Sequence, residues 1–437
     1  GLLRLLVAAT MGRCRGCPHA LRAARPTLLS MRPTCPPALL SHLMSSNHFR
    51  AYDDQGRQVE YVDHKRWAWA LSVVYPLLPF VGMAAHAVTD WQLALALPLL
   101  LSYGLMPLLD YLIGEDENNP PEAVVEQLEL DRYYRWLTWA TVPLHFVALI
   151  GCAWWVGTQQ LSWWAVLLMA YIAGVDSGLG INTGHELGHK NNRTEQWLAR
   201  LVLAVPAYGH FTVEHGRGHH RWVATPEDHA SSRMGESIYR FALRELPGGI
   251  RRAWQFETER LTRSGEPAWS WSNTMLQSYA VSLALQLGLF VAFGWVMLPF
   301  LLVHNLVAWW QLTSANYVEH YGLLRGRLPD GRYETPAPHH SWNANHLVSN
   351  LTLFHLQRHS DHHAYPSRRY QSLRHFEQLP QLPNGYFGMF PVAYVPSWWF
   401  RVMDPRLLAL PHVGGNMARV NVCPRQRERL QAMYGAR

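Results

Sequence analysis

The sequence predicts an all-α, polytopic membrane protein with six transmembrane helices, arranged as three hairpins with a cytoplasmic, His-rich helical cap. Three observations lead to this fold class. The 437-residue chain contains uncharged runs of about 20 apolar residues, the length that spans a bilayer as a helix. It has 20 tryptophans, a residue enriched where transmembrane helices meet the membrane surface. Its hydrophilic segments lie before the first run or after even-numbered runs, so they share one side of the membrane.

The apolar runs come in three pairs. In chain order they cover residues 67–89, 91–113, 136–157, 161–182, 275–296 and 298–318. Asp90 alone separates the first two runs, three residues separate the third from the fourth, and the last pair turns near 295–299. Helices joined by such short connections are antiparallel neighbours. Each pair is therefore predicted to form a hairpin.

The hydrophilic segments contain nearly all the lysine and arginine of the membrane part. They cover residues 51–66, 114–135, 184–274 and 319–437. Because positive charge collects on cytoplasmic loops, these segments are predicted to face the cytoplasm. The net charge of +7 comes from residues 1–52, which have seven arginines and no acidic residue, so charge gives no indication of nucleic-acid binding.

One membrane domain is predicted over residues 51–420. Residues 1–50 are rich in arginine and proline and have no apolar run long enough to span a membrane. We predict that they are an N-terminal extension that is disordered or not native. Residues 421–437 are predicted to be a C-terminal tail.

Eight histidines lie in three short blocks beside the apolar runs, with the patterns HxxxH, HxxxHH and HxxHH. The blocks are His185–His189, His215–His220 and His359–His363. Residues four apart lie on one face of a helix, so His185 is expected to point the same way as His189, His215 as His219, and His359 as His363. The adjacent His219 and His220 diverge by about 100° around a helix, so one block can supply two metal centres. Eight nitrogen donors are too many for one four-coordinate zinc. Two metal ions fit better, and imidazole suits iron as well as zinc or copper.

Two further observations concern these blocks. His320 follows the sixth run, level with the blocks, and is a ninth candidate ligand. His185–His189 also matches HExxH, the motif in which Glu186 would be the general base of a zinc peptidase. A membrane zinc peptidase is therefore an alternative, although it leaves most of the other histidines without a role.

Five motifs resemble the bacterial integral-membrane alkane 1-monooxygenase family, within the membrane fatty acid desaturase/hydroxylase superfamily. They are HELGHK, EHGRGHHRWVATPEDHASS, NYVEHYGL, HSWNANH and LQRHSDHHAYPSRRYQSLR, and the similarity runs from about residue 50 to 420. The resemblance implies a non-haem di-iron centre. Its implied ligands are His185, His189, His215, His219, His220, His320, His359, His362 and His363.

The same resemblance implies terminal hydroxylation of medium- to long-chain n-alkanes to 1-alkanols, with O2 as co-substrate and a bacterial inner-membrane location. The n-alkane would enter from the membrane lipid. Electrons would come from rubredoxin, and NAD(P)H would act only indirectly, through rubredoxin reductase. A related hydroxylase or desaturase acting on aromatic methyl groups or fatty acyl chains is the alternative.

Several residues near the blocks are assigned supporting roles. Carboxylates suited to accept an imidazole N–H and fix its tautomer are Glu186, Asp228, Glu319 and Asp361. A structural salt bridge is an equal alternative for each. His229 stands where the family usually has proline, and we predict a supporting or surface position for it rather than a tenth ligand.

Other predictions are less specific. A scaffold role is predicted for His339, His340, His346 and His355. Candidates for lining a substrate channel are Tyr103, Met106 and Leu109, with plain helix packing favoured for each. A basic face for an acidic electron donor could be formed by Arg368, Arg369, Arg374, Arg401 and Arg406.

Overall fold

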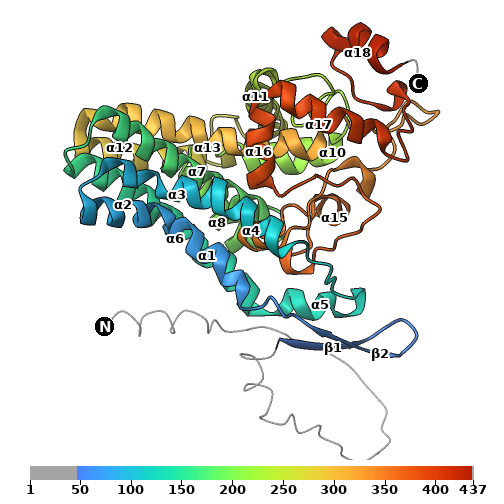
Figure 1. Cartoon of the computed structure of the whole chain (residues 1–437), viewed down its shortest axis with the longest axis horizontal. Coiled ribbons are helices and arrows are strands. Elements are labelled where there is room, and N and C mark those ends of the chain that lie inside the picture. The colour runs from blue at the N-terminus through green and yellow to red at the C-terminus, as the bar shows by residue number, and fades with distance from the viewer. Residues whose placement is uncertain (1–46, 436–437) are drawn as a thin grey trace, which may run out of the picture. The chain divides into compact units, whose positions relative to one another are not determined.

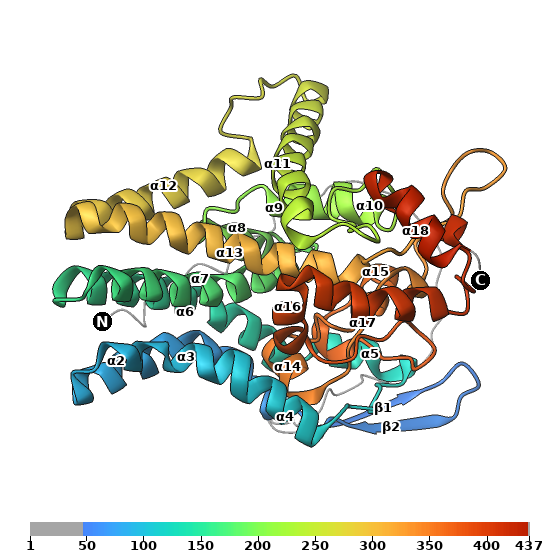
Figure 2. The same cartoon turned by 45° about the horizontal axis from the view of Figure 1, so that its top comes forward.

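Helices make up most of the computed structural model, which describes residues 47–435. Long apolar helices lie side by side in a bundle, and shorter elements gather around one end of it (Figures 1 and 2). Five segments are long and apolar enough to cross a membrane: Ala68–Thr89, Gln92–Ile113, Arg132–Thr158, Trp163–Gly188 and Thr274–His320. The prediction of a mostly helical, multi-pass membrane protein is confirmed.

Prolines divide the first two apolar segments into short helical pieces. The first consists of η3 (Ala68–Ala70), α1 (Leu71–Val74), η4 (Tyr75–Leu77) and α2 (Leu78–Thr89). The second consists of η5 (Gln92–Ala96), α3 (Leu97–Leu100), the π-helical η6 (Leu101–Leu105) and α4 (Met106–Ile113). Because proline has no N–H to donate, regular α-helical hydrogen bonding is interrupted at each one. Asp90 ends α2 in the left-handed conformation, with φ of 54°.

Helix α7 (Trp163–Gly188) is the most enclosed of the five segments: 67% of the residues in its most apolar stretch of 18 are buried. It packs against α6 (Arg132–Thr158) on one side and α13 (Met297–His320) on another. A side chain at Gly174 would lie 2.6 Å from Val307 Cβ, and one at Gly178 would lie 2.5 Å from Gln311 Cβ. These two glycines therefore let α7 and α13 approach closely, as small residues do between membrane helices.

The fifth apolar segment, of 47 residues, contains two helices. Asn273 caps the start of α12 (Thr274–Phe293), where its Oδ1 accepts a 3.0 Å hydrogen bond from Met275 N. The helix ends at Gly294, which has φ of 75°, and the short turn η8 (Gly294–Val296) leads into α13. We predicted the turn near 295–299. The left-handed glycine ends the helix earlier.

The remaining helices build the region around the end of the bundle. They are α5 (Glu122–Leu130), α8 (Arg193–Ala204), α9 (Phe211–Glu214), η7 (His215–His219), α10 (His220–Trp222), α11 (Ile238–Arg263), α14 (Leu347–Thr352), α15 (His359–Ala364), α16 (Tyr386–Tyr394), α17 (Pro396–Ala409) and α18 (Arg427–Tyr434). The 3₁₀ turns among them are η9 (Pro338–His340), η10 (Tyr370–Ser372), η11 (Met417–Arg419) and η12 (Pro424–Gln426).

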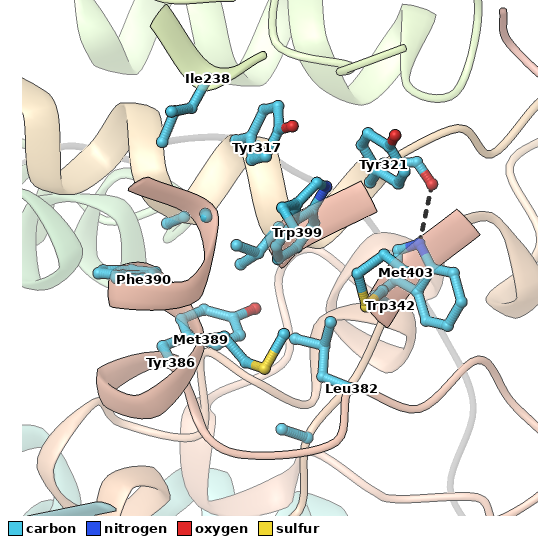
Figure 3. Packing of buried hydrophobic residues seen from close by; sticks show 14 of the residues in the cluster. Ile238, Tyr317, Tyr321, Trp342, Leu382, Tyr386, Met389, Phe390, Trp399 and Met403 are labelled. Atoms are coloured by element: carbon cyan, nitrogen blue, oxygen red, sulfur yellow. Dashed lines mark hydrogen bonds between the residues drawn. The ribbon is translucent and has the colours of Figure 1, made fainter. Parts of the chain in front are cut away.

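A buried aromatic core fixes the end of α13 to α17 (Figure 3). Trp399 of α17 packs against Tyr317 and Tyr321, with ring centroids 5.1 and 5.3 Å apart. The indole N–H of Trp342 donates a 2.9 Å hydrogen bond to the carbonyl of Tyr321. Because His320 lies between Tyr317 and Tyr321, this core sets where its side chain points.

The structure corrects the all-α prediction in one place. Strands β1 (His48–Tyr52) and β2 (Gln58–Val62) form an antiparallel hairpin, which turns at Gly56 with φ of 72°. Phe49 and Tyr61 are its buried residues and face one another across the two strands. The strands are short and mostly polar, so their sequence gave little sign of a sheet. The described fold thus begins before residue 51.

The predicted domain boundaries at residues 51 and 420 stay predictions. Residues 1–46 of the predicted N-terminal extension lie outside the described residues, as do residues 436–437. Residues 421–435 of the predicted C-terminal tail pack on the rest of the fold: Val422 bridges to Met234, and Leu430 of α18 is buried.

Candidate metal centre

Each histidine block sits where a helix meets the end of the bundle. His185 lies in the last turn of α7, and His189 is the residue that ends this helix. The second block forms η7 and the start of α10, while the third lies in α15. His320 is the last residue of α13. Helices α7 and α13 therefore place His185, His189 and His320, and the short elements η7, α10 and α15 place the other six histidines.

The structure gathers the nine histidines into two compact groups. In each group, one ring nitrogen of every member lies within 4.8 Å of the others. Cluster A contains His185, His189, His215, His220 and His362. Cluster B contains His219, His320, His359 and His363. Histidines four apart lie in one cluster in the first and third blocks, as predicted, but His215 and His219 lie in different clusters. The adjacent His219 and His220 are divided between the two clusters, as their divergence around a helix predicts.

The Nε2 atoms in both clusters point at one another. In cluster A, His362 Nε2 lies 2.9 Å from His185 Nε2 and 3.2 Å from His220 Nε2. In cluster B, His359 Nε2 lies 3.2 Å from His320 Nε2 and 2.9 Å from His363 Nε2. Two nitrogens bound at right angles to one ion, each at about 2.1 Å, are about 3.0 Å apart. The nitrogen spacing therefore fits a bound metal ion.

Buried ring nitrogens without a hydrogen-bond partner also indicate a metal site. Among the described residues, Nε2 of His189 and Nε2 of His219 are buried and have no hydrogen-bond partner. Burial, followed by the charge of neighbouring histidines, holds the pKa of His215, His220 and His362 well below its usual value. These rings are therefore neutral, which is the form that binds a metal.

The division of the second block has a local cause. Residues His215–His219 form a π-helical turn, whose hydrogen bonds join residues five apart rather than four. His220, five residues after His215, thereby joins the same cluster, with 3.1 Å between the two Nε2 atoms. His219 points to cluster B instead. The divergence of His219 and His220 was predicted, but helical spacing of four residues wrongly placed His215 with His219.

One carboxylate orients a histidine of cluster B. Asp228 Oδ2 lies 2.8 Å from His219 Nδ1 and also accepts a 2.7 Å hydrogen bond from Ser231 Oγ, while Arg252 binds Oδ1 at 2.8 Å. Although burial acts to raise it, His219 and Arg252 hold the pKa of the Asp228 carboxyl far below its usual value. Asp228 is therefore ionised and accepts the Nδ1 proton, which leaves Nε2 of His219 free to face the cluster.

Residues of both clusters line an apolar cavity. Its wall includes His185 and His215 of cluster A, His359 of cluster B, and the carboxyl of Glu319. The remaining lining residues are Gly178, Leu179, Asn182, Phe211, Gln311, Leu312, Ala315, Asn316, Leu353, Leu356, Tyr386, Phe387 and Phe390. An apolar cavity with a few polar groups at one end is the usual form of a small-molecule site.

The comparisons with known proteins agree with this site. Residues 161–393, which span all three blocks and His320, match the family described as fatty acid desaturase. The chain is 53% identical over 377 residues to alkane 1-monooxygenase 1 of Alcanivorax borkumensis, covering 86% of this chain and 93% of that protein. It is 55% identical over 349 residues to alkane 1-monooxygenase of Pseudomonas putida, covering 80% and 87%. The chain belongs to the alkane 1-monooxygenase family.

A relative named for a different substrate is less similar to this chain. The xylene/toluene monooxygenase hydroxylase component XylM of Pseudomonas putida is 28% identical over 245 residues, which cover 55% of this chain and 63% of that protein. The higher identity and longer coverage of the alkane 1-monooxygenases confirm the resemblance that the motifs indicated.

The other three predicted carboxylates of this family member differ in their contacts. Glu319 Oε1 accepts a 2.9 Å hydrogen bond from Tyr386 Oη, and its Oε2 lies 3.4 Å from His359 Nε2. Glu186 pairs with Lys190 at 3.0 Å, and Asp361 pairs with Arg368 at 3.2 Å. Glu319 thus lies beside cluster B, whereas the contacts of Glu186 and Asp361 are the structural salt bridges of the alternative reading.

The extra histidines occupy supporting positions. The backbone carbonyl of His340 accepts a 3.4 Å hydrogen bond from His320 Nδ1. His340 also forms a third group with Glu334 and His339. The Nδ1 of His340 accepts a 2.9 Å hydrogen bond from Ala337 N, so its proton sits on Nε2, 3.2 Å from Glu334 Oε1. A protonated Nε2 does not bind a metal, and this group is best described as a hydrogen-bonded support.

The remaining histidines lie in other parts of the structure. His355 Nδ1 lies 2.9 Å from the Tyr370 carbonyl, and His346 is joined to Glu115 by a backbone bridge. His229 lies outside both clusters. A side chain on Gly248 of α11 would come within 2.4 Å of its ring. His229 therefore packs on α11 at the edge of the site.

The predicted substrate-lining residues pack elsewhere. Tyr103 Oη donates a 2.7 Å hydrogen bond to Gln311 Oε1, behind the cavity wall, and Met106 and Leu109 belong to the hydrophobic core. The sequence missed Phe387 and Phe390, which lie on α16 far along the chain from the channel helices. No motif marks them.

The five arginines of the predicted basic face differ in exposure and in their contacts. Arg369 forms two hydrogen bonds with Glu195, at 2.8 and 2.9 Å, and Arg374 pairs with Glu122 at 2.7 Å. Arg368 and Arg369 are buried. Arg401 and Arg406 on α17 are exposed. Three of the five arginines are therefore used to hold the fold together.

Proposed function

We propose that the protein inserts one oxygen atom of O2 into the terminal C–H bond of a medium- to long-chain n-alkane at a di-iron centre. Cluster A would hold one iron and cluster B the other. The single observation that carries this proposal is the apolar cavity, because histidines of both clusters are among its lining residues. A saturated hydrocarbon has no polar group to recognise, so an apolar cavity is the environment it needs.

The residues around the clusters have defined tasks in this proposal. When bound, the irons would supply the oxidising power that side chains lack. Asp228 holds His219 in the tautomer that exposes Nε2. Phe387 and Phe390 of α16 and Leu312 of α13 enclose the chain of the substrate and exclude water. The names of the relatives, alkane 1-monooxygenase, support an alkane as the substrate.

The donor set favours iron over the zinc peptidase alternative. A peptidase base at Glu186 would have to face the metal, but its carboxylate is paired with Lys190 at 3.0 Å. Nine histidines in two clusters also exceed what one zinc needs.

We further propose that all six apolar helices cross the membrane and that the metal clusters face the cytoplasm of a bacterial inner membrane. The 47-residue segment Thr274–His320 would be about 70 Å long as one helix, more than twice the hydrocarbon core of about 30 Å. Its turn at Gly294–Val296 instead supports two crossings by α12 and α13. Cytoplasmic placement is supported by the lysine and arginine of the hydrophilic segments.

Rubredoxin, reduced by an NAD(P)H-dependent rubredoxin reductase, is the proposed electron donor. The exposed residues Arg401 and Arg406 of α17 could contact an acidic protein of this kind.

The test uses full-length protein purified in detergent. Metal content and products are measured after incubation with n-octane or n-dodecane, O2 and a reduced rubredoxin system. About two irons per chain and a 1-alkanol are expected. Bound zinc with peptidase activity, an alkene, or oxidation of xylene in preference to alkanes would each assign a different function.

A further inference from the structure

A second cavity lies directly behind the wall of the apolar cavity. Glu214, His229 and Glu245 are among its lining residues. Phe211, Leu312 and Asn316 line both cavities, so they form the wall between the two. The second cavity therefore adjoins the apolar cavity at these three residues.

Glu245 of α11 is a buried carboxyl held at this wall by neutral groups. Its Oε2 accepts a 2.7 Å hydrogen bond from Thr313 Oγ1, and its Oε1 accepts a 3.1 Å hydrogen bond from Asn316 Nδ2. Glu214, in the same cavity, is bound instead by the guanidinium of Arg252. A buried carboxyl without a cationic partner is costly to ionise, and such groups are often functional.

The surroundings of Glu245 bring the pKa of its carboxyl close to neutral pH. Burial raises its pKa to about 7; Glu214 adds to the rise, while Thr313, Asn316 and Arg244 oppose it. The other titratable groups that face the second cavity are Tyr208, His210 and His229. Near neutral pH, Glu245 can therefore both release and take up a proton.

The proposed reaction needs protons inside an apolar site. Conversion of RH and O2 to ROH and H2O consumes two electrons, which the rubredoxin-type donor supplies, and two protons. The O–O bond breaks, one oxygen enters the C–H bond, and the other leaves as water with the two protons. Much of the lining of the apolar cavity is leucine, alanine and phenylalanine, which carry no proton; its carboxyl, that of Glu319, is hydrogen-bonded to Tyr386 and lies beside His359 of cluster B.

We propose that Glu245 is the proton relay of this enzyme, receiving protons from solvent past His229 and passing them beside Asn316 into the cavity that holds the metal clusters. The carboxyl gives its proton toward the oxygen that leaves as water and is reprotonated from the second cavity. His229, half-buried beside Gly248, stands at the outer side of this route. This role rests on the proposed monooxygenase function. Glu245 does not line the apolar cavity itself, so its proposed role is to deliver protons and not to contact the substrate.

The first experiment follows the carboxyl itself and needs no turnover. Infrared difference spectra of the full-length, metal-free protein are recorded between pH 5 and 9. Protonated-carboxyl absorption that disappears near pH 7 is expected. Other buried carboxyls absorb in the same region, so the intensity lost between pH 5 and 9 is compared between proteins, and Glu245→Gln should lack the share that belongs to Glu245. The control is Glu259→Gln, an exposed position on the same helix, in which the full intensity should remain. An intensity change in Glu245→Gln equal to that of the wild type would overturn the assignment.

The second experiment separates a relay from a structural anchor. In the wild type, the alkanol rate should fall as pH rises through about 7, because the protonated carboxyl is the donor. Glu245→Gln should keep its iron and its KM for the alkane, lose at least about tenfold in kcat, and lose this pH dependence. More hydrogen peroxide should be released per alkanol formed.

Two outcomes decide between the proposals. A Glu245→Gln protein with full iron, a near-normal rate and an unchanged pH profile would exclude the relay. Absence of alkanol from the wild type would instead reject the proposed function, while the infrared titration would still test the carboxyl. If Glu245→Gln does not fold, Thr313→Val is the second variant. It removes a hydrogen bond that lowers the pKa of Glu245, so the pH at which the alkanol rate falls should move to a higher value. An unchanged pH dependence of the rate would exclude the relay.

Discussion

Asp228 and His219 form a buried pair in which a carboxylate oxygen lies 2.8 Å from a ring nitrogen on the side away from cluster B. Arg252 joins this carboxylate to Glu214, so α11 takes part in holding the histidine. A side chain on Gly218 would lie 2.7 Å from Arg252 Nε. The glycine between His215 and His219 is therefore needed for Arg252 to reach the pair.

Replacing Asp228 with asparagine should weaken the iron of cluster B. The amide lacks the charge that favours a proton on His219 Nδ1, and losses of about 10–100-fold in metal affinity are typical for such changes. Iron remaining after competition with a chelator measures the effect. Asp330→Asn, at an exposed turn, is the matched control. Equal retention in both variants would show that the pair does not orient a ligand.

His320→Ala should reduce the iron content from about two ions to about one, because His320 belongs only to cluster B. Alkane hydroxylation should be lost with it. His339→Ala changes a nearby histidine of the hydrogen-bonded support and should keep both ions. Metal analysis by mass spectrometry decides the matter, and undiminished iron in His320→Ala would remove this residue from the ligand set.

The length of the preferred alkane should follow the cavity wall. Ala315→Leu narrows the apolar cavity from α13, so it should favour short alkanes over long ones. Because a few methylenes in an apolar pocket change discrimination by about 10–200-fold, the ratio of kcat/KM for n-octane and n-hexadecane should shift at least about tenfold. Leu302→Ala, exposed on the same helix, is the control. An unchanged ratio would place the substrate elsewhere.

Stability should depend on pH through Asp404 of α17. Burial raises its pKa to about 6, although hydrogen bonds from Tyr321 and Tyr434 oppose the rise. Because the folded pKa lies above the unfolded value, its stabilising contribution is full below about pH 4 and is lost as pH rises through 6. The loss at pH 7.5 is at most about 3 kcal/mol.

Asp404→Asn should therefore raise the Tm at pH 7.5 and leave it unchanged at pH 4. Thermal unfolding in detergent at the two pH values measures this, with Asp330→Asn as the exposed control. A lower Tm of Asp404→Asn at pH 7.5 would show that the charged form is stabilising.

The apolar helices and the histidine blocks were predictable because each depends on local sequence. Runs of apolar residues set the helices, and the positions of His185 and His320 at run ends set the level of the site. The union of nine histidines in two clusters followed from these positions and from the family resemblance. Their role as ligands stays a prediction.

Features that depend on distant contacts were not predictable. The π-helical turn divides His215 from His219, which a regular helix would keep together. Phe390 reaches the cavity only because α16 packs against α13. Arg369 is buried against Glu195, a partner 174 residues away that no local pattern identifies. The β1–β2 hairpin is too short and polar to be distinguished from a loop.

The close crossing of α7 and α13 at Gly174 and Gly178 has a consequence for the two histidine clusters. Helix α7 ends in a residue of cluster A, and α13 ends in a residue of cluster B. Any sliding of one helix along the other would therefore change the separation of the two clusters. Because membrane helices adjust to the thickness of the bilayer, lipids of different chain length offer a way to change that separation without changing the sequence.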